Sequence, residues 1–244
     1  MRLREARISA QNLATNAAAA VGNGCRLADV SADGYGHGGA RVATLAMLAG
    51  FDSVYVAGVD EAIRLRHAGF GGDIRTDAVP KWRRHDAREA RIGELGGDRA
   101  IIARDVLYGF DGVSASTLRL SARALSVKTI NRGDGVSYGY TFRATERGST
   151  ALIAIGYGDG IHRRAGNRAT VRLAGADRPI IGRVAMNVFV VWLGDDRAAI
   201  GDEAVLFGDP RRGEPRVQDW AAQVQDHPAV VTATLGPRVI RSTR

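Results

Sequence analysis

The chain has 244 residues, 45% of them hydrophobic, a formal net charge of +8 and one cysteine, Cys25. No apolar run approaches the roughly twenty residues that cross a membrane, and the charged start at residues 1–7 leads into no apolar segment, so we expect neither a membrane span nor a secretory signal. A single cysteine excludes an internal disulfide and fits a reducing cytoplasm.

The positive charge invites a nucleic-acid interpretation, but its distribution does not favour one. Lysine occurs only at Lys81 and Lys128, and the remaining basic residues are arginines spread along the chain. The densest cluster, residues 81–85, is more typical of a solvated segment than of a phosphate-binding patch. Binding of nucleic acid is therefore kept only as a weak alternative.

The first part of the chain alternates helical and strand patterns. Ser9 is a suitable cap for a helix over residues 8–20. The expected elements that follow are strands at 26–30, 53–57 and 73–75, and helices at 39–48 and 60–68. This βαβαβ order predicts a parallel, right-handed arrangement, as in a TIM-like barrel.

The barrel pattern then stops early. Residues 77–97 are charged and show little periodicity, and only residues 101–109 again look like a strand and helix unit. A complete (βα)8 barrel needs roughly 200 residues or more. We therefore expect an incomplete barrel with exposed sheet edges, or one that another chain completes.

The second part consists of short strand-like runs separated by Gly and Asp turns. The expected strands are 151–155, 168–173, 178–182, 187–193, 203–207 and 229–234, with one helix at 217–224. Many short strands of this kind indicate an all-β domain. The predicted fold class is thus α/β, a partial TIM-like βα barrel over residues 1–115, followed by an all-β domain over residues 116–244.

Several motifs occur in a recognisable order. Residues 30–38 read Val-Ser-Ala-Asp-Gly-Tyr-Gly-His-Gly, and the later segments include Val-Ser-Tyr-Gly, Ile-Gly-Tyr-Gly-Asp-Gly, Gly-Arg-Val-Ala-Met-Asn and Leu-Gly-Pro-Arg-Val. Together they resemble the alanine racemase family, whose first motif is Val-Lys-Ala-Asp-Ala-Tyr-Gly-His-Gly. In that family the lysine carries pyridoxal phosphate as a Schiff base, and a tyrosine from the neighbouring subunit of a dimer is the second catalytic base.

The resemblance assigns roles to individual residues. Ser31 occupies the position of the absent lysine, and Tyr138 that of the second base. Tyr35 corresponds to a tyrosine that contacts the cofactor phosphate. The family's arginine that pairs with the pyridine nitrogen falls at Ile102 here. Arg104, two residues away, is our candidate for that role, and Arg91, in the Arg-Ile-Gly of residues 91–93, is the alternative. On the substrate side the resemblance implies Tyr157 and Met186; no metal site is expected.

The missing lysine decides the functional expectation. A hydroxyl cannot form an imine, so covalent attachment of pyridoxal phosphate is not expected, although the family resemblance implies that cofactor. The resemblance implies a cytoplasmic isomerase of cell-wall precursor metabolism that acts on alanine or another small amino acid. We expect a degenerate or weakly active homologue. The alternative is a non-catalytic module that pairs with an intact racemase subunit, so that the chain forms a homodimer or such a heterodimer.

Overall fold

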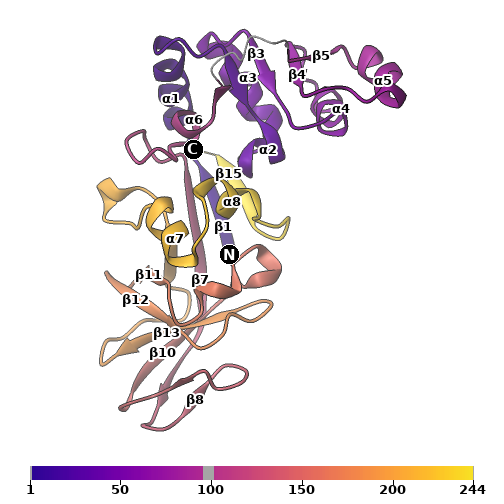
Figure 1. The fold of residues 1–244 in the computed structure, drawn as a ribbon. Helices are drawn as coiled ribbons and strands as arrows, with labels where there is room; N and C mark the ends of the chain where they lie inside the picture. The colour runs from indigo at the N-terminus through magenta and orange to yellow at the C-terminus, as the bar shows by residue number, and fades with distance from the viewer. Residues whose placement is uncertain (1, 96–101, 244) are drawn as a thin grey trace. The chain divides into compact units, whose positions relative to one another are not determined.

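A computed structural model describes residues 2–95 and 102–243 (Figure 1). Contacts divide the chain into two compact units, residues 9–117 and residues 1–8 together with 118–244. The first unit combines helices with a parallel sheet and the second is mainly β-structure, which confirms the predicted fold class. The predicted functional domains, 1–115 and 116–244, stay a prediction, although residues 1–8 make their contacts with the β unit.

The α/β unit is built on one five-stranded sheet. Its strands are β2 (Leu27–Asp29), β3 (Ser53–Tyr55), β4 (Ile74–Thr76), β5 (Ile92–Glu94) and β6 (Ile102–Ala103). The order is β5-β4-β3-β2-β6, and each neighbouring pair is parallel. In the part of the chain that the structure describes, β5 and β6 are the two outer strands and do not pair with each other, so the sheet remains an open fragment of a barrel.

Short helices connect these strands. They are α1 (Ala10–Gly22), α2 (Ser31–Tyr35), α3 (Gly39–Ala49), α4 (Val59–His67), α5 (Arg84–Glu89) and α6 (Asp105–Tyr108). The Ser9 side chain accepts a hydrogen bond from the Asn12 N–H, which confirms the predicted helix cap. In α4, acidic residues occupy the first turn and basic residues the last, as the helix dipole favours.

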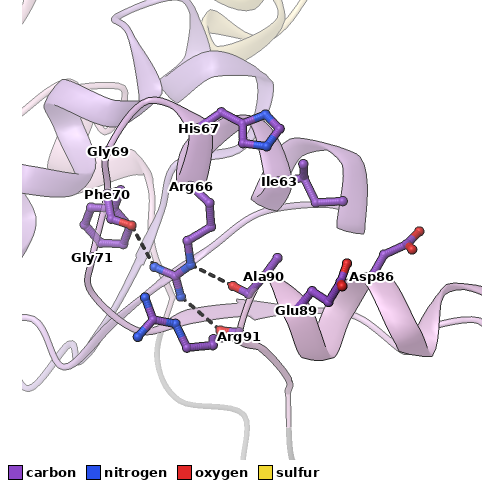
Figure 2. A pocket seen from close by; sticks show the side chains of 10 residues that line it. All are labelled: Ile63, Arg66, His67, Gly69, Phe70, Gly71, Asp86, Glu89, Ala90 and Arg91. Atoms are coloured by element: carbon purple, nitrogen blue, oxygen red, sulfur yellow. Dashed lines mark hydrogen bonds between the residues drawn. The ribbon is translucent and has the colours of Figure 1, made fainter.

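Arg66 holds the end of α4 against the outer strand of the sheet. Its guanidinium donates to the carbonyl oxygens of Phe70 (2.8 Å), Gly72 (2.6 Å), Ala90 (2.7 Å) and Arg91 (2.9 Å), as Figure 2 shows in part. Since these carbonyls belong to the α4–β4 and α5–β5 connections, one side chain satisfies several backbone acceptors that have no ladder partner.

The β unit contains a closed ring of strands. They are β7 (Leu118–Ile130), β10 (Gly148–Ile153), β11 (Thr170–Leu173), β12 (Ala176–Ile181), β13 (Phe189–Gly194) and β14 (Glu203–Phe207). The order is β10-β13-β12-β11-β14-β7, and β7 pairs again with β10, which closes the ring. The long β7 is shared, because its first half pairs with β14 and its second half with β10.

Two further strands extend the sheet beyond β7. They are β1 (Arg4–Ile8), antiparallel to β7, and β15 (Ile240–Thr243), parallel to β1. A separate ribbon consists of β8 (Gly135–Val136) and β9 (Phe142–Arg143). The helices of this unit are α7 (Val217–Val224) and α8 (Pro228–Ala233).

The segment at 229–234, predicted to be a strand, is a helix, and that prediction was wrong. Pro228 occupies the first turn of α8, where its missing N–H removes no helical hydrogen bond. His227 caps the helix, because its Nδ1 accepts from the Ala229 N–H at 3.1 Å. These start signals outweigh the β-branched residues Val230, Val231 and Thr232, which suggested a strand.

Candidate functional site

The segment that follows β2 is a left-handed turn. Labelled α2 in Figure 1, it has positive φ angles at Ala32 (52°), Asp33 (55°), Gly34 (61°), Tyr35 (51°) and Gly36 (80°). For a residue other than glycine this conformation costs about 1–2 kcal/mol. Three such costs within four residues, at Ala32, Asp33 and Tyr35, are typical of functional sites rather than of ordinary connections when surrounding contacts compensate them.

Hydrogen bonds from both sides hold this turn. The Asp33 side chain accepts from the Gly39 N–H at 2.7 Å, and the Asp33 N–H donates to Glu61 Oε1 at 2.9 Å. His37 is completely buried, and its Nδ1 lies 3.0 Å from the carbonyl oxygens of Gly34 and Tyr35. Because carbonyl oxygens only accept, Nδ1 carries a proton. The turn is thereby fixed in a conformation that its sequence alone disfavours.

Asp29, the last residue of β2, lies at the centre of the polar contacts. Its carboxylate is 7% exposed and accepts from the Ser31 N–H at 3.0 Å and from the Tyr35 hydroxyl at 2.6 Å. The Tyr108 hydroxyl donates to the Asp29 carbonyl at 2.9 Å. The rings of Tyr35 and Tyr108 pack edge to face, with their centroids 5.2 Å apart.

Ser31 begins the turn and is also buried. Its Oγ has no hydrogen-bond partner, and within the described residues Arg178 Nε is the only other buried side-chain polar atom in that condition. A buried hydroxyl without a partner is unusual, because desolvation costs about 1–3 kcal/mol. The two lysines of the chain are exposed elsewhere, Lys81 after β4 and Lys128 on β7 of the β unit.

Arg104 approaches the same cluster from the connection between β6 and α6. It forms an ion pair with Asp105 at 2.7 Å, and this contact, more than the neighbouring Tyr35, raises the pKa of the guanidinium. Burial, followed by the hydrogen bond to Asp29, raises the pKa of Tyr35, and Arg104 opposes this shift. The structure therefore brings Ser31 and Tyr35 to Asp29, with Arg104 beside Tyr35. Ile102 lies on the outer strand β6 and is 40% exposed.

The other candidates lie on the β unit and are exposed. Tyr138 is 86% exposed, in a loop between β8 and β9 where Ser137 has a φ of 61°. Tyr157 and Met186 lie on segments joined by two backbone hydrogen bonds. The Gly158 N–H donates to the Met186 carbonyl at 2.9 Å, and the Tyr157 N–H donates to the Ala185 carbonyl at 3.0 Å. Tyr157 also has the Arg163 guanidinium above its ring, 5.5 Å from the centroid.

Two pockets are not lined by these candidates themselves. One of about 500 Å³ lies between α4 and α5 of the α/β unit, with Arg66 and Arg91 on its wall (Figure 2). A second, of about 440 Å³, lies on the β unit beside β1 and β15 and is lined by Arg2, Arg4 and Arg238. In residues 2–95 and 102–243 there is no group of three or more His, Cys, Asp or Glu placed to hold a metal. Over the same residues the helices are too short or too polar to span a bilayer.

Sequence reasoning identified Ser31 and Tyr35 but missed Asp29 and Tyr108, which complete the cluster. The signal for Asp29 was present, since it is a carboxylate at the end of the otherwise apolar strand β2. Charged residues at the carboxyl ends of barrel strands are typical of site residues. Tyr108 has no comparable local signal, because its hydroxyl meets β2 only through the fold.

Comparison with known families divides along the same two parts of the chain. Residues 8–92 match the family model described as the N-terminal domain of alanine racemase, and residues 117–243 match that of its C-terminal domain. The alanine racemase of Thermobifida fusca is 44% identical over 124 residues, which are 51% of this chain and 33% of that protein. That of Salinispora tropica is 36% identical over 173 residues, 68% of this chain and 46% of that protein. This chain thus spans between a third and a half of the length of these relatives.

Solved structures agree with these matches. Alanine racemase from D-cycloserine-producing Streptomyces lavendulae has a TM-score of 0.87 at 25% identity, covering 100% of this chain and 97% of that one. Alanine racemase from Bartonella henselae, solved with covalently bound pyridoxal phosphate, has a TM-score of 0.84 at 16% identity, covering 99% of both chains. At that identity the second likeness shows the fold alone.

Proposed function

This chain belongs to the alanine racemase family, and we propose that it is a member without the covalent cofactor site, which racemises alanine weakly or not at all. Racemisation removes the weakly acidic Cα proton and returns it on the opposite face, so it needs a base on each face. Pyridoxal phosphate supplies the electron sink that makes the carbanion accessible. In the family the cofactor lysine is also one of the two bases, so its loss removes two functions.

The observation that carries the proposal is Ser31. Its hydroxyl stands at the position of the cofactor lysine, and a hydroxyl cannot form an imine with an aldehyde. Ser31 is buried and its Oγ has no partner, which supports a former site position whose side chain is now shorter and lacks an amine. Neither exposed lysine lies in this cluster, which supports the loss of the covalent link.

The residues around Ser31 do not fit covalently held pyridoxal phosphate. Tyr35, which the family resemblance places at a phosphate-contacting position, donates its hydroxyl hydrogen bond to the Asp29 carboxylate at 2.6 Å. A phosphate placed there would meet a buried carboxylate, and like charges at such distances are unfavourable. We also propose that the protein is cytoplasmic and that the substrate of any residual activity is alanine or another small amino acid.

A second candidate function is assembly with an intact racemase subunit, in the cell's production of D-alanine for the cell wall. The observation that favours it is Tyr138, which is 86% exposed on the β unit. In the family the tyrosine at this position reaches into the active site of the neighbouring subunit. We propose that Tyr138, with Tyr157 and Met186 on neighbouring loops, is available to a homodimer or to a heterodimer with a full-length racemase.

The first proposal is tested by the rate at which purified protein, supplied with pyridoxal phosphate, interconverts L- and D-alanine. The Ser31→Ala variant and free pyridoxal phosphate are the controls. We expect the same low rate in all three, and no imine absorbance beyond that which free pyridoxal phosphate gives with alanine. A wild-type rate well above both controls, with an imine spectrum, would overturn the proposal.

The second proposal is tested by mixing the chain with a full-length alanine racemase whose own second-base tyrosine has been replaced by phenylalanine. If the chain forms heterodimers, its Tyr138 should restore activity, and the Tyr138→Phe chain should form the same complex without restoring it. A chain that stays monomeric by light scattering in the presence of the racemase would contradict assembly.

A further inference from the structure

Asp29 is a buried carboxylate without a positively charged partner. Among the described residues no ion pair includes it, and its two hydrogen bonds come from the neutral Ser31 N–H and Tyr35 hydroxyl. The nearby cation, Arg104, pairs with Asp105 and also interacts with the Tyr35 hydroxyl. The negative charge of Asp29 is therefore held by neutral donors and, among the described residues, is not neutralised by an ion pair.

This charge has a consequence for phosphate. A tyrosine hydroxyl has one proton to donate, and phosphate oxygens at neutral pH mainly accept. While Tyr35 donates to Asp29 at 2.6 Å, it presents only its lone pairs to a phosphate. The carboxylate adds repulsion between like charges to this loss of a donor.

It has a second consequence for an amine at position 31. The Ser31 N–H lies 3.0 Å from Asp29 Oδ1, so the side chain at position 31 starts beside the carboxylate. A carboxylate within about 4–6 Å raises the pKa of an amine by roughly one to three units. Only the unprotonated amine attacks an aldehyde, so the reactive fraction would fall about ten- to a thousandfold.

We propose that Asp29, independently of Ser31, is a second cause of the loss of the cofactor site. Its carboxylate excludes phosphate from Tyr35 and holds an amine at position 31 in its protonated form. The proposal rests on the proposed function in one respect, that residues 30–38 are the former cofactor segment. It predicts that restoring the lysine alone does not restore the site, because Asp29 must be neutralised as well.

The decisive experiment compares Ser31→Lys with the double variant Ser31→Lys/Asp29→Asn. The chain has only two natural lysines, so the introduced one is readily assigned in an NMR pH titration of labelled lysine side chains. We expect its pKa to be higher by about one unit or more in the single variant, and imine formation with pyridoxal phosphate to begin at a correspondingly higher pH. Equal pKa values in the two variants would overturn the proposal, whether or not either binds the cofactor.

Ser31→Lys/Asp33→Asn is the matched control. Asp33 is in the same turn, and with Glu61 and Arg104 it makes up the other charged groups around the cluster. Its carboxylate caps the Gly39 N–H rather than contacting Ser31 or Tyr35. We expect its removal to lower the pKa of the introduced lysine less than removal of Asp29 does. A shift as large as that of Asp29→Asn would contradict a specific role for Asp29.

Since Ser31 is buried, a lysine there could prevent folding, so a second test keeps the serine. Asp29→Asn alone should bind pyridoxal phosphate non-covalently about tenfold more tightly than wild type, measured by fluorescence, and Asp29→Asn/Tyr35→Phe should lose that gain. An unchanged Kd, or undetectable binding in both proteins, would refute the proposal. Racemase activity of the wild type would overturn the proposed function without affecting either of these comparisons.

Discussion

His37 Nε2 lies 2.9 Å from Thr117 Oγ1, and this contact joins the left-handed turn after β2 to the last residue of the α/β unit, eighty positions away in the chain. Thr117 is 1% exposed and also donates to the Tyr108 carbonyl at 2.7 Å. Its hydroxyl therefore connects the turn after β2 with the segment that carries Tyr108.

Thr117→Val keeps the shape of the side chain and removes this hydroxyl. We expect the free energy of unfolding to fall by about 1–3 kcal/mol, because the Tyr108 carbonyl loses its hydroxyl donor and the buried His37 Nε2 loses its polar neighbour. Urea denaturation measures the change. Thr44→Val is the control, since Thr44 is exposed on α3 and its hydroxyl only bonds back to the Ala40 carbonyl; equal losses in both variants would argue against the connection.

Tyr35→Phe tests how strongly the Asp29 carboxylate depends on its neutral donors. Among the described residues, removing the hydroxyl leaves the buried carboxylate with the Ser31 N–H as its remaining hydrogen-bond donor. We expect a loss of about 1–3 kcal/mol in unfolding free energy. Tyr140→Phe, at a tyrosine that is 62% exposed, should change stability by less than about 0.5 kcal/mol. An unchanged unfolding free energy in Tyr35→Phe would mean that this hydrogen bond contributes nothing to stability.

Gly34→Ala tests the left-handed turn. At Gly34 φ is 61°, and an added Cβ would lie 3.2 Å from Val42 Cγ2 and 3.3 Å from Gly39 Cα. Conformational strain and crowding together should lower the unfolding free energy by about 2 kcal/mol or more. The control is Gly22→Ala, at a glycine without positive φ and with open space around it, which should be neutral or slightly stabilising. Thermal unfolding of the two variants separates these outcomes.

Local signals were sufficient for several elements. Residues 217–224 and 203–207 have the predicted bounds, because each has its own periodicity and clear boundaries. β1 was not predicted, since residues 4–8 become a strand only by pairing with β7 and β15, more than a hundred positions away. The predicted strand at 229–234 is instead a helix, because the local Pro228 start signal outweighs the β-branched composition of the segment.

The candidate site was predictable as far as motifs reach. Ser31, Tyr35 and Tyr138 follow from the order of short segments, and their roles stay predictions. The left-handed turn was not foreseen, because Ala32 and Asp33 adopt it against their own preference and only the contacts to Gly39, Glu61 and His37 impose it. The pairing of Tyr35 with Asp29 likewise depends on three-dimensional geometry.

Glu203 in the β unit provides a prediction about pH. Its carboxylate receives hydrogen bonds from Arg119 (2.8 Å) and Ser121 (2.7 Å), and these contacts, Arg119 first, lower its pKa from 4.5 to about 2. A carboxyl group whose pKa is lower in the folded state stabilises that state above its unfolded pKa, and this contribution disappears as the pH falls. It should therefore be complete above about pH 5 and vanish between about pH 4.5 and 2.

Glu203→Gln should remove most of this contribution to the unfolding free energy. For a pKa shift of this size the contribution is at most about 3 kcal/mol, and the side chain is only 26% exposed. Denaturant unfolding at pH 6 should show a difference of about 1–3 kcal/mol from wild type, because glutamine keeps part of the hydrogen bonding to Arg119. At pH 3 the difference should be markedly smaller, since wild-type Glu203 then contributes less. Glu146→Gln, at an exposed position, should show little difference at either pH. A gap between wild type and Glu203→Gln that is as large at pH 3 as at pH 6 would show that shape rather than charge at this position stabilises the β unit.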